Sequence, residues 1–311
     1  MLISFAMSSA SAADAPEDIP RPEYREPEAR PVPSIPPTLR GGKPIEEFVW
    51  TLAASMPENS PTTVWVREIG KSRKGRPILM ISLARTDCRD TPCSNVMVVA
   101  AQHGNEPAGT RAVLELLRAV VTGDQELPPG VVVHMVPIAN PDGTVAFSRR
   151  TADGGNINRD WESRRLPETK AISRVISEIN PDALIDLHEQ TPGCPAGMYV
   201  AGGPADRAVG VLSAVSDALK AKGLRVPVRK EGKSGSTRLL HHHFAKAYGR
   251  PALIVESKYV RKAEADLNTR SAIHKTTVTA VLQSLSSRVS YAASARQELS
   301  RTGATRHQGT Q

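Results

Sequence analysis

The chain has 311 residues, enough for one large α/β domain, and its hydrophobic content of 40% and charged content of 23% are typical of a globular protein. Every apolar run is shorter than the roughly 18 residues that a membrane-spanning helix needs, so the sequence predicts no transmembrane segment. The formal net charge of +8 suits carboxylate-bearing substrates or acidic surfaces, whereas an aromatic content of only 4% argues against nucleic acid as a partner.

The first residues, MLISFAMSSASAADAP, hold a short apolar stretch and then small residues, as at the end of a secretory signal peptide. The usual basic region is missing, and an unstructured N-terminus is the alternative. We interpret residues 1–13 as the remnant of a signal peptide, which predicts a periplasmic or secreted protein. Residues 14–42 contain eight prolines and are predicted to form an extended arm or linker.

One folded domain is predicted over residues 43–290. Residues 45–56 have helical periodicity, and TVWVREIG and PILMISLA are predicted strands joined by the polar loop KSRKGR. Cys88 and Cys93 follow, at a spacing that allows a small disulfide to join a hairpin in an oxidising compartment, with two free thiols as the alternative. The third cysteine, Cys194, is then either a free thiol or an alternative disulfide partner.

Beyond the cysteines, apolar strands alternate with amphipathic helices. The predicted strands are 96–102, 131–139, 183–189 and 251–257, and the predicted helices are 108–121, 168–179, 206–223 and 266–287. This alternation predicts an α/β fold, namely a three-layer α/β/α arrangement with a central, mostly parallel but mixed sheet. Residues 291–311 are predicted to be a disordered tail.

Polar residues follow four of the apolar strands, where open α/β sheets bind their ligands. They are His103 with Glu106, the NPDG stretch at 140–143, His188, and Glu256. Two imidazoles and one carboxylate form the ligand set of a catalytic zinc. Glu256 is a carboxylate in an otherwise apolar strand, and burying it is costly unless it stays neutral or faces a cation. Taken singly, each has a structural alternative, such as a hydrogen-bonded histidine or a favourable charge at a helix N-terminus.

The segment NPDGTVAFSRRTADGGNINRDW, residues 140–161, connects these motifs. With it, the sequence resembles the zinc carboxypeptidase family, the metallocarboxypeptidases of the carboxypeptidase A type. In that family HxxE, NPDG, an Arg, an Asn-Arg pair, a distant His and a late Glu occur in this order. The resemblance extends over roughly residues 45–287 and includes the hairpin IGKSRKGRPI. It implies a metallocarboxypeptidase-like fold and a zinc hydrolase with one Zn²⁺ per chain.

The resemblance also implies roles for individual residues. His103, Glu106 and His188 would bind zinc, and Glu256 would act as the general base toward the zinc-activated water. Such a metal lowers the pKa of its water toward about 7 and polarises the scissile carbonyl.

The resemblance implies two further roles for residues of the segment 140–161. Arg149 would stabilise the oxyanion, with Arg150 as the fallback if the loop register differs by one residue. Asn158 and Arg159 would grip the terminal carboxylate of a peptide substrate, because the planar guanidinium can hold two oxygens at once. A solvated polar loop is the alternative for these residues.

Several positions depart from the family pattern. Asn105, a predicted substrate-binding residue, stands inside HxxE where carboxypeptidase A-like members carry an Arg. Asn156 replaces an Asp that often orients a zinc-bound His, although an amide oxygen can accept the same hydrogen bond. Gln190 replaces a Tyr, and the family's mobile Tyr has no clear counterpart, Tyr248 being the one candidate. The run His241 to His243 is not expected to form a second metal site, because consecutive helical residues point in different directions.

The predicted function is therefore a zinc-dependent carboxypeptidase that hydrolyses a C-terminal peptide or amide bond, with cell-wall peptides as a candidate substrate and cell-wall association as a corollary. A first alternative is a zinc-dependent deacylase of N-acyl amino acids, because HGNE also resembles the succinylglutamate desuccinylase and aspartoacylase group. A second is a non-catalytic carboxylate-binding protein. NPDG, NINRDW and the GKSRKGRPI hairpin argue against the first, and Glu256 argues against the second.

Overall fold

The computed structural model describes residues 32–89, 91–190, 197–201, 205–230, 236–258 and 264–305. The predicted signal peptide remnant, the first part of the predicted arm and Cys194 lie outside these ranges. Of the arm, residues 32–42 are described; they form neither helix nor strand, and Leu39 packs into the main hydrophobic core.

The described strands form one mixed sheet in the order β1-β2-β4-β3-β5-β8-β6-β7. The strands are β1 (Thr62–Lys71), β2 (Pro77–Arg85), β3 (Ser94–Ala100), β4 (Val131–Val136), β5 (Ala183–Gln190), β6 (Gly197–Ala201), β7 (Val228–Lys230) and β8 (Ala252–Lys258). The middle strands β4, β3, β5 and β8 are parallel to their neighbours in this group, whereas β1 with β2, β2 with β4, and β6 with β8 pair antiparallel. The carboxyl ends of β3, β5 and β8 therefore lie at the same edge of the sheet.

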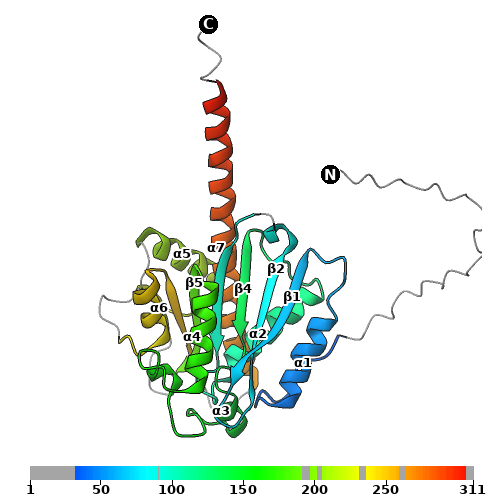
Figure 1. Ribbon diagram of the computed structural model, residues 1–311, viewed down its shortest axis with the longest axis vertical. Coiled ribbons are helices and arrows are strands. Elements are labelled where there is room, and N and C mark those ends of the chain that lie inside the picture. The colour runs from blue at the N-terminus through cyan, green and yellow to red at the C-terminus, as the bar shows by residue number, and fades with distance from the viewer. Residues whose placement is uncertain are drawn as a thin grey trace, which may run out of the picture. The chain divides into compact units, whose positions relative to one another are not determined.

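Helices cover the sheet on its two faces (Figure 1). They are α1 (Lys43–Ala54), α2 (Pro107–Val121), α3 (Pro141–Ala146), α4 (Pro167–Ile179), α5 (Ala205–Ala221), α6 (Leu240–Tyr248) and α7 (Glu264–Thr305), with short 3-10 turns η1 (Thr86–Arg89) and η2 (Ile157–Arg159). One core lies between the sheet and α1, α2, α5 and α7, and the other between the sheet and α4 and α6. The predicted three-layer α/β/α arrangement with a mixed sheet is confirmed.

Two details differ from the sequence-based prediction. Helix α7 continues to Thr305, past residue 290 where we expected a disordered tail, and the added stretch YAASARQELS is rich in Ala, Arg, Gln, Glu and Leu, which favour helix. The strands on either side of the cysteines do not form a hairpin, because β4 lies between β2 and β3 in the sheet. No described helix is both long enough and apolar enough to cross a membrane.

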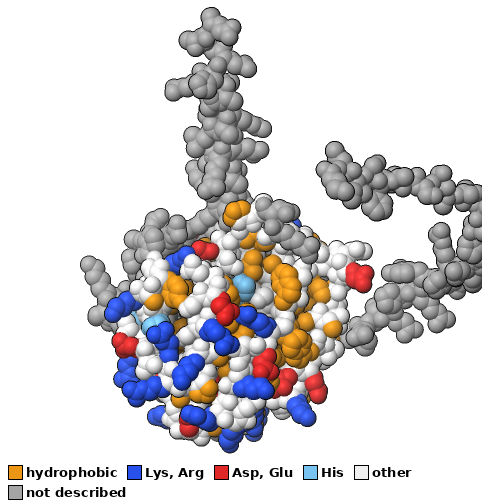
Figure 2. Space-filling model, viewed as in Figure 1, with side chains coloured by type: hydrophobic (Ala, Val, Ile, Leu, Met, Phe, Trp, Pro, Cys, Tyr) orange, Lys and Arg blue, Asp and Glu red, His pale blue; other side chains and the backbone are white. Residues whose placement is uncertain are grey.

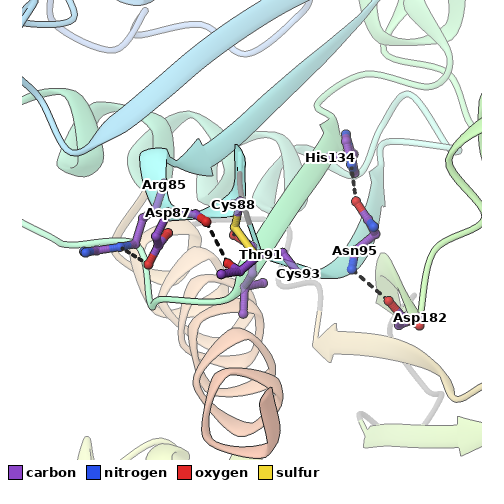
Figure 3. The surroundings of a disulfide bond; sticks show 9 residues. Arg85, Asp87, Cys88, Thr91, Cys93, Asn95, His134 and Asp182 are labelled. Carbon is purple, nitrogen blue, oxygen red and sulfur yellow. Dashed lines mark hydrogen bonds and ion pairs between the residues drawn. A yellow bond between two sulfur atoms is a disulfide. The ribbon is translucent and has the colours of Figure 1, made fainter. Parts of the chain in front are cut away.

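The predicted disulfide between Cys88 and Cys93 is present, with a Cα–Cα distance of 5.6 Å (Figure 3). It closes the connection between β2 and β3, where the Thr91 hydroxyl donates to the backbone carbonyl of Asp87. Beside it, the β3 and β4 side chains Asn95 and His134 are hydrogen-bonded to each other. The bridge therefore fixes the start of β3, the strand that leads to His103.

Gly104 allows the HGNE and NPDG segments to pack against each other, and Gly143 allows the NPDG segment to fold tightly on itself. A Cβ at Gly104 would lie 2.0 Å from the backbone carbon of Gly143, and a Cβ at Gly143 would lie 2.4 Å from the Asn140 side chain. Neither position therefore has room for a side chain. This close approach sets the distance between the residues after β3 and the loop that carries Arg149.

The hairpin motif GKSRKGRPI is bound to the same loop through Asp142. The buried Asp142 carboxylate accepts hydrogen bonds from the Ser72 hydroxyl at 2.9 Å and the Lys74 backbone N–H at 2.9 Å, and it pairs with the Arg76 guanidinium at 2.6 Å. A buried carboxylate held by several donors is a strong structural contact. The hairpin therefore holds the NPDG loop at the edge of the sheet.

Candidate metal centre and active-site cavity

Three predicted ligands meet at the carboxyl ends of the parallel strands. His103 follows β3, Glu106 precedes the first residue of α2, and His188 lies near the end of β5. One candidate ligand atom from each lies within 4.8 Å of the other two, and all three side chains are buried. The Glu106 carboxylate faces Nδ1 of His103 at 2.7 Å and Nδ1 of His188 at 2.9 Å. Two imidazoles and a carboxylate at this spacing are suited to bind a zinc ion.

The electrostatics of this cluster also favour a cation. Burial opposes ionisation of Glu106, but His103 and His188 outweigh it and lower the Glu106 pKa to about 2. Burial likewise disfavours a charged His188, yet the carboxylates of Asp186 and Glu106 raise its pKa well above the usual value. Two buried carboxylates thus face the same imidazole, so positive charge is stabilised here.

Each imidazole has a different partner at its Nε2 atom. The His103 Nε2 atom lies 3.3 Å from the side-chain oxygen of Asn156, as the sequence suggested for an amide at this position. The His188 Nε2 atom lies 3.1 Å from the carboxylate of Asp186. One histidine is therefore held by a neutral group and the other by a charged one.

The ligands open into a cavity of about 330 Å³. The residues lining it are His103, Glu106, Arg149, Asn158, Arg159, His188, Glu189, Gln190, Leu239, Ile254 and Glu256. Glu256 of β8 lies opposite His188 in the pairing of β5 with β8, and burial raises its pKa to about 7 although the nearby His188 lowers it. A carboxyl with a pKa near neutrality is suited to exchange protons.

The two candidate arginines of the loop point in different directions. Arg149 lines the cavity and donates from Nη1 to the Glu106 carboxylate at 2.9 Å. Arg150 instead donates to the backbone carbonyl of Gly154 at 3.0 Å, within its own loop. The structure therefore puts Arg149, rather than the fallback Arg150, at the cavity.

Asn158 and Arg159 both line the cavity from the 3-10 turn η2. Asn158 is buried, and its side-chain oxygen accepts from the backbone N–H of Leu240 at 3.4 Å. Burial lowers the pKa of Arg159, and the neighbouring cations Arg149 and Arg238 lower it further. This concentration of positive charge is suited to bind a carboxylate.

Other predicted positions lie away from the cavity lining. Asn105, predicted to contact substrate, does not line it, and its buried side-chain oxygen has no hydrogen-bond partner among the described residues. Tyr248 stacks on Phe244 and borders a different pocket, next to Ser177. Gln190, in contrast, does line the cavity.

A buried ion pair beside the ligands was not predicted from the sequence. The Glu189 carboxylate accepts from the backbone N–H of Ala108 at 2.6 Å and pairs with Arg270 of α7, which also contacts Asp266. The Glu189 backbone N–H donates to Glu106 at 3.2 Å. These contacts attach the ligand-bearing ends of β5 and α2 to helix α7.

Comparison with known proteins agrees with this site. Residues 50–194 match the family model described as zinc carboxypeptidase, a range that includes the three candidate ligands but not Glu256. Over this range, a little under half of its length, the chain is therefore similar to zinc carboxypeptidases. A probable carboxypeptidase 2 of Arthroderma benhamiae is 30% identical over 131 residues, which are 40% of this chain and 25% of the relative. The chain thus spans about a quarter of the length of such curated relatives.

Solved structures resemble the fold more widely. A metallo-carboxypeptidase from Burkholderia cenocepacia has a TM-score of 0.64 at 23% identity, covering 78% of this chain and 69% of that one. The carboxypeptidase A of Helicoverpa armigera has a TM-score of 0.63 at 18% identity, covering 82% and 75%. The metallocarboxypeptidase-like fold expected from the sequence is confirmed.

Proposed function

We propose that the chain is a zinc-dependent carboxypeptidase that releases the C-terminal residue of a peptide. One observation carries this proposal. A metal-ligand set, a carboxyl with a near-neutral pKa and a group of cations line one cavity, at the carboxyl edge of a metallocarboxypeptidase-like sheet. Each of these is needed to hydrolyse a bond next to a free carboxylate.

His103, Glu106 and His188 would hold one zinc ion per chain, because their donor atoms are close together and the buried carboxylates around them favour a cation. Zinc in such a site supplies Lewis acidity, which polarises a carbonyl and makes water a better nucleophile.

Glu256 would accept a proton from the attacking water and deliver it to the leaving amine. The support is its position in the cavity beside His188 and its pKa of about 7, which lets it hold and release a proton near neutral pH. Arg149 carries positive charge at the same cavity and would stabilise the negative charge that develops on the carbonyl oxygen.

Asn158 and Arg159 would bind the terminal carboxylate of the substrate. Arg159 is exposed to the cavity and lies near other cations, so an entering carboxylate relieves repulsion as well as forming hydrogen bonds. This requirement for a free carboxylate would distinguish a carboxypeptidase from an enzyme that cuts inside a chain.

Mass spectrometry of products tests the proposal. Zinc-loaded protein would be incubated with free-acid peptides, the same peptides as C-terminal amides, muropeptide stems and N-succinyl amino acids, with Glu256→Gln as the control. We expect release of a terminal residue from free-acid substrates only, and its loss in the variant. Cleavage confined to N-succinyl amino acids would make the protein a deacylase, and silence on every substrate would favour a binding protein.

A cell-wall substrate is the finer part of the proposal. It is supported by the net charge of +8, by the Lys and Arg side chains spread over the face in Figure 2, and by Gln190, which lines the cavity in place of a Tyr. We expect muropeptide stems to be turned over faster than ordinary peptides with the same terminal residue. No turnover of any muropeptide would exclude this substrate while leaving the peptidase proposal standing.

We further propose that the protein acts in the periplasm or outside the cell. The Cys88–Cys93 disulfide supports this, because such bonds persist in oxidising compartments and are rare in the cytosol. Fractionation of the native cells, with alkylation of free thiols before lysis, tests it. A protein found in the cytosolic fraction with Cys88 and Cys93 alkylated would contradict it.

A further inference from the structure

Asp186 is a buried carboxylate that takes no part in the proposed reaction. It lies on β5 two residues before His188, so the two side chains point to the same face of the sheet. Asp186 is fully buried, and among the described residues no Lys or Arg forms an ion pair with it. An isolated buried charge is costly, so its presence requires a compensating interaction.

One oxygen of the Asp186 carboxylate contacts two side chains, those of His188 and Gln102. The Asp186 oxygen Oδ1 lies 3.1 Å from His188 Nε2 and accepts from the Gln102 side-chain amide at 2.6 Å. The Gln102 amide is oriented by Trp161, whose indole N–H donates to the Gln102 side-chain oxygen at 2.7 Å. Because the indole can only donate, the Gln102 nitrogen must face Asp186.

With a metal at Nδ1, this chain of contacts would decide the place of the remaining hydrogen of His188. The Gln102 nitrogen also lies 3.3 Å from His188 Nε2, but it is closer to the Asp186 oxygen, to which it donates at 2.6 Å. Because that carboxylate oxygen can only accept, Asp186 selects the form of His188 with hydrogen on Nε2. The lone pair then lies on Nδ1, the atom that faces Glu106 at 2.9 Å within the ligand group.

We propose that Asp186 is a positioning residue that fixes the Nε2–H tautomer of His188 and thereby directs the Nδ1 lone pair toward the metal. The inference rests on the proposed zinc site. Asp186 raises the basicity of one ligand only, since His103 has the neutral Asn156 at the corresponding atom. The two histidines are thus unequal ligands, and His188 is the stronger.

The surroundings of the second Asp186 oxygen, Oδ2, allow the charge of Asp186 to be removed without removing its contacts. It is buried and has no hydrogen-bond partner among the described residues, so an Asn can present its oxygen to His188 and Gln102 and its nitrogen at the unpaired position. Asp186→Asn therefore removes the charge and keeps the contacts, whereas Asp186→Leu removes the charge and the acceptor. Asp182→Asn is the matched control, since Asp182 precedes the same strand at its opposite end and accepts from the Asn95 backbone N–H.

Zinc affinity, measured by competition with a chromophoric chelator, is the first readout. We expect it to fall about 10-fold in Asp186→Asn and toward 100-fold in Asp186→Leu, with Asp182→Asn unchanged. Asn156→Asp, which puts a carboxylate behind His103, is expected to restore part of the affinity lost in Asp186→Asn. A merely structural role for Asp186 would not predict this rescue.

The imidazole tautomers, read by ¹H–¹⁵N NMR of zinc-loaded, histidine-labelled protein, are the second readout. We expect the Nε2–H form of His188 in the wild type and a mixture of forms in Asp186→Leu. Unchanged affinity and tautomer in both Asp186 variants would overturn the inference and leave the peptidase proposal intact. A wild type that binds no zinc would overturn the proposed function and the inference together, which separates the two failures.

Discussion

His188 and Glu256 lie directly opposite each other in the parallel pairing of β5 with β8, so a candidate metal ligand and a candidate proton acceptor share one face of the sheet. The geometry predicts that replacing Glu256 with Gln removes proton transfer without removing the metal. We expect kcat to fall by about 10²- to 10⁴-fold, the usual contribution of a general base or acid. Zinc content by atomic emission is the control, and we expect it to be unchanged.

The loop arginines offer a matched pair. Arg149→Gln is expected to lower kcat by about 10²- to 10³-fold, because it removes the cation that would stabilise the oxyanion. Arg150→Gln is the control, since Arg150 contacts the Gly154 carbonyl in its own loop. Steady-state kinetics of the two variants on one free-acid peptide distinguish them. Equal losses in both variants would assign the effect to the loop as a whole.

Asp142 is expected to contribute to stability rather than to chemistry. Asp142→Ala leaves the Ser72 hydroxyl, the Lys74 backbone N–H and the Arg76 guanidinium without their carboxylate, so we expect a loss of about 3 kcal/mol in the free energy of unfolding. Urea denaturation measures it. The matched variant Asp153→Ala removes a partly exposed carboxylate that pairs with Arg73, and it should cost less than about 1 kcal/mol.

The disulfide supplies a prediction about stability alone. Replacing Cys88 and Cys93 together with Ser opens a loop with a sequence separation of 5, and loop-closure entropy predicts a loss of about 2 kcal/mol in the free energy of unfolding. The loop precedes β3, and His103 follows the opposite end of that strand, so peptide turnover at low temperature should remain near wild type. A variant as stable as the wild type would show that the bridge is not a stabilising element.

His134 predicts part of the acid sensitivity of the fold. Burial, with the nearby Arg67, lowers its pKa from 6.5 to about 4. His134 is hydrogen-bonded to the Ser82 hydroxyl and to the Asn95 side chain, and Figure 3 shows the contact with Asn95. The unfolded chain therefore binds a proton at a higher pH than the folded one. The contribution is fully present above about pH 6.5 and is lost as the pH falls toward 4.

The expected size of this effect is about 2 kcal/mol between pH 7 and pH 5. Urea denaturation of the wild type and of His134→Gln at these two pH values measures it. The wild type should lose more stability than the variant over this interval. Equal losses would mean that His134 does not titrate differently in the folded and unfolded states.

The strands and helices could be predicted from the sequence wherever the local pattern of apolar residues is strong. The apolar strands and the amphipathic helices were predictable because their periodicities are long and regular. The order of the strands was not, and the hairpin expected around Cys88 and Cys93 is wrong because β4, more than 30 residues later in the chain, pairs between β2 and β3. Such long-range pairing has no signature in a local window. Strands β6 and β7 were missed because they have only 5 and 3 residues.

The site was predictable where a single residue breaks a pattern. Glu256 was predictable because a carboxylate in an apolar strand requires a partner, and the same reasoning applies to Asp186 in ALIDLHE. The roles of Gln102 and Trp161 could not be predicted, since their contacts join residues 59 positions apart. The close approach of Gly104 to Gly143 likewise depends on two loops meeting in space.

One measurement tests the central claim most directly. The protein would be stripped of metal, reloaded with one equivalent of zinc, and given a single peptide as the free acid and as the C-terminal amide, with the released amino acid quantified. We expect release from the free acid only, dependent on zinc and abolished by Glu256→Gln. Equal release from the acid and the amide, or release without metal, would contradict it.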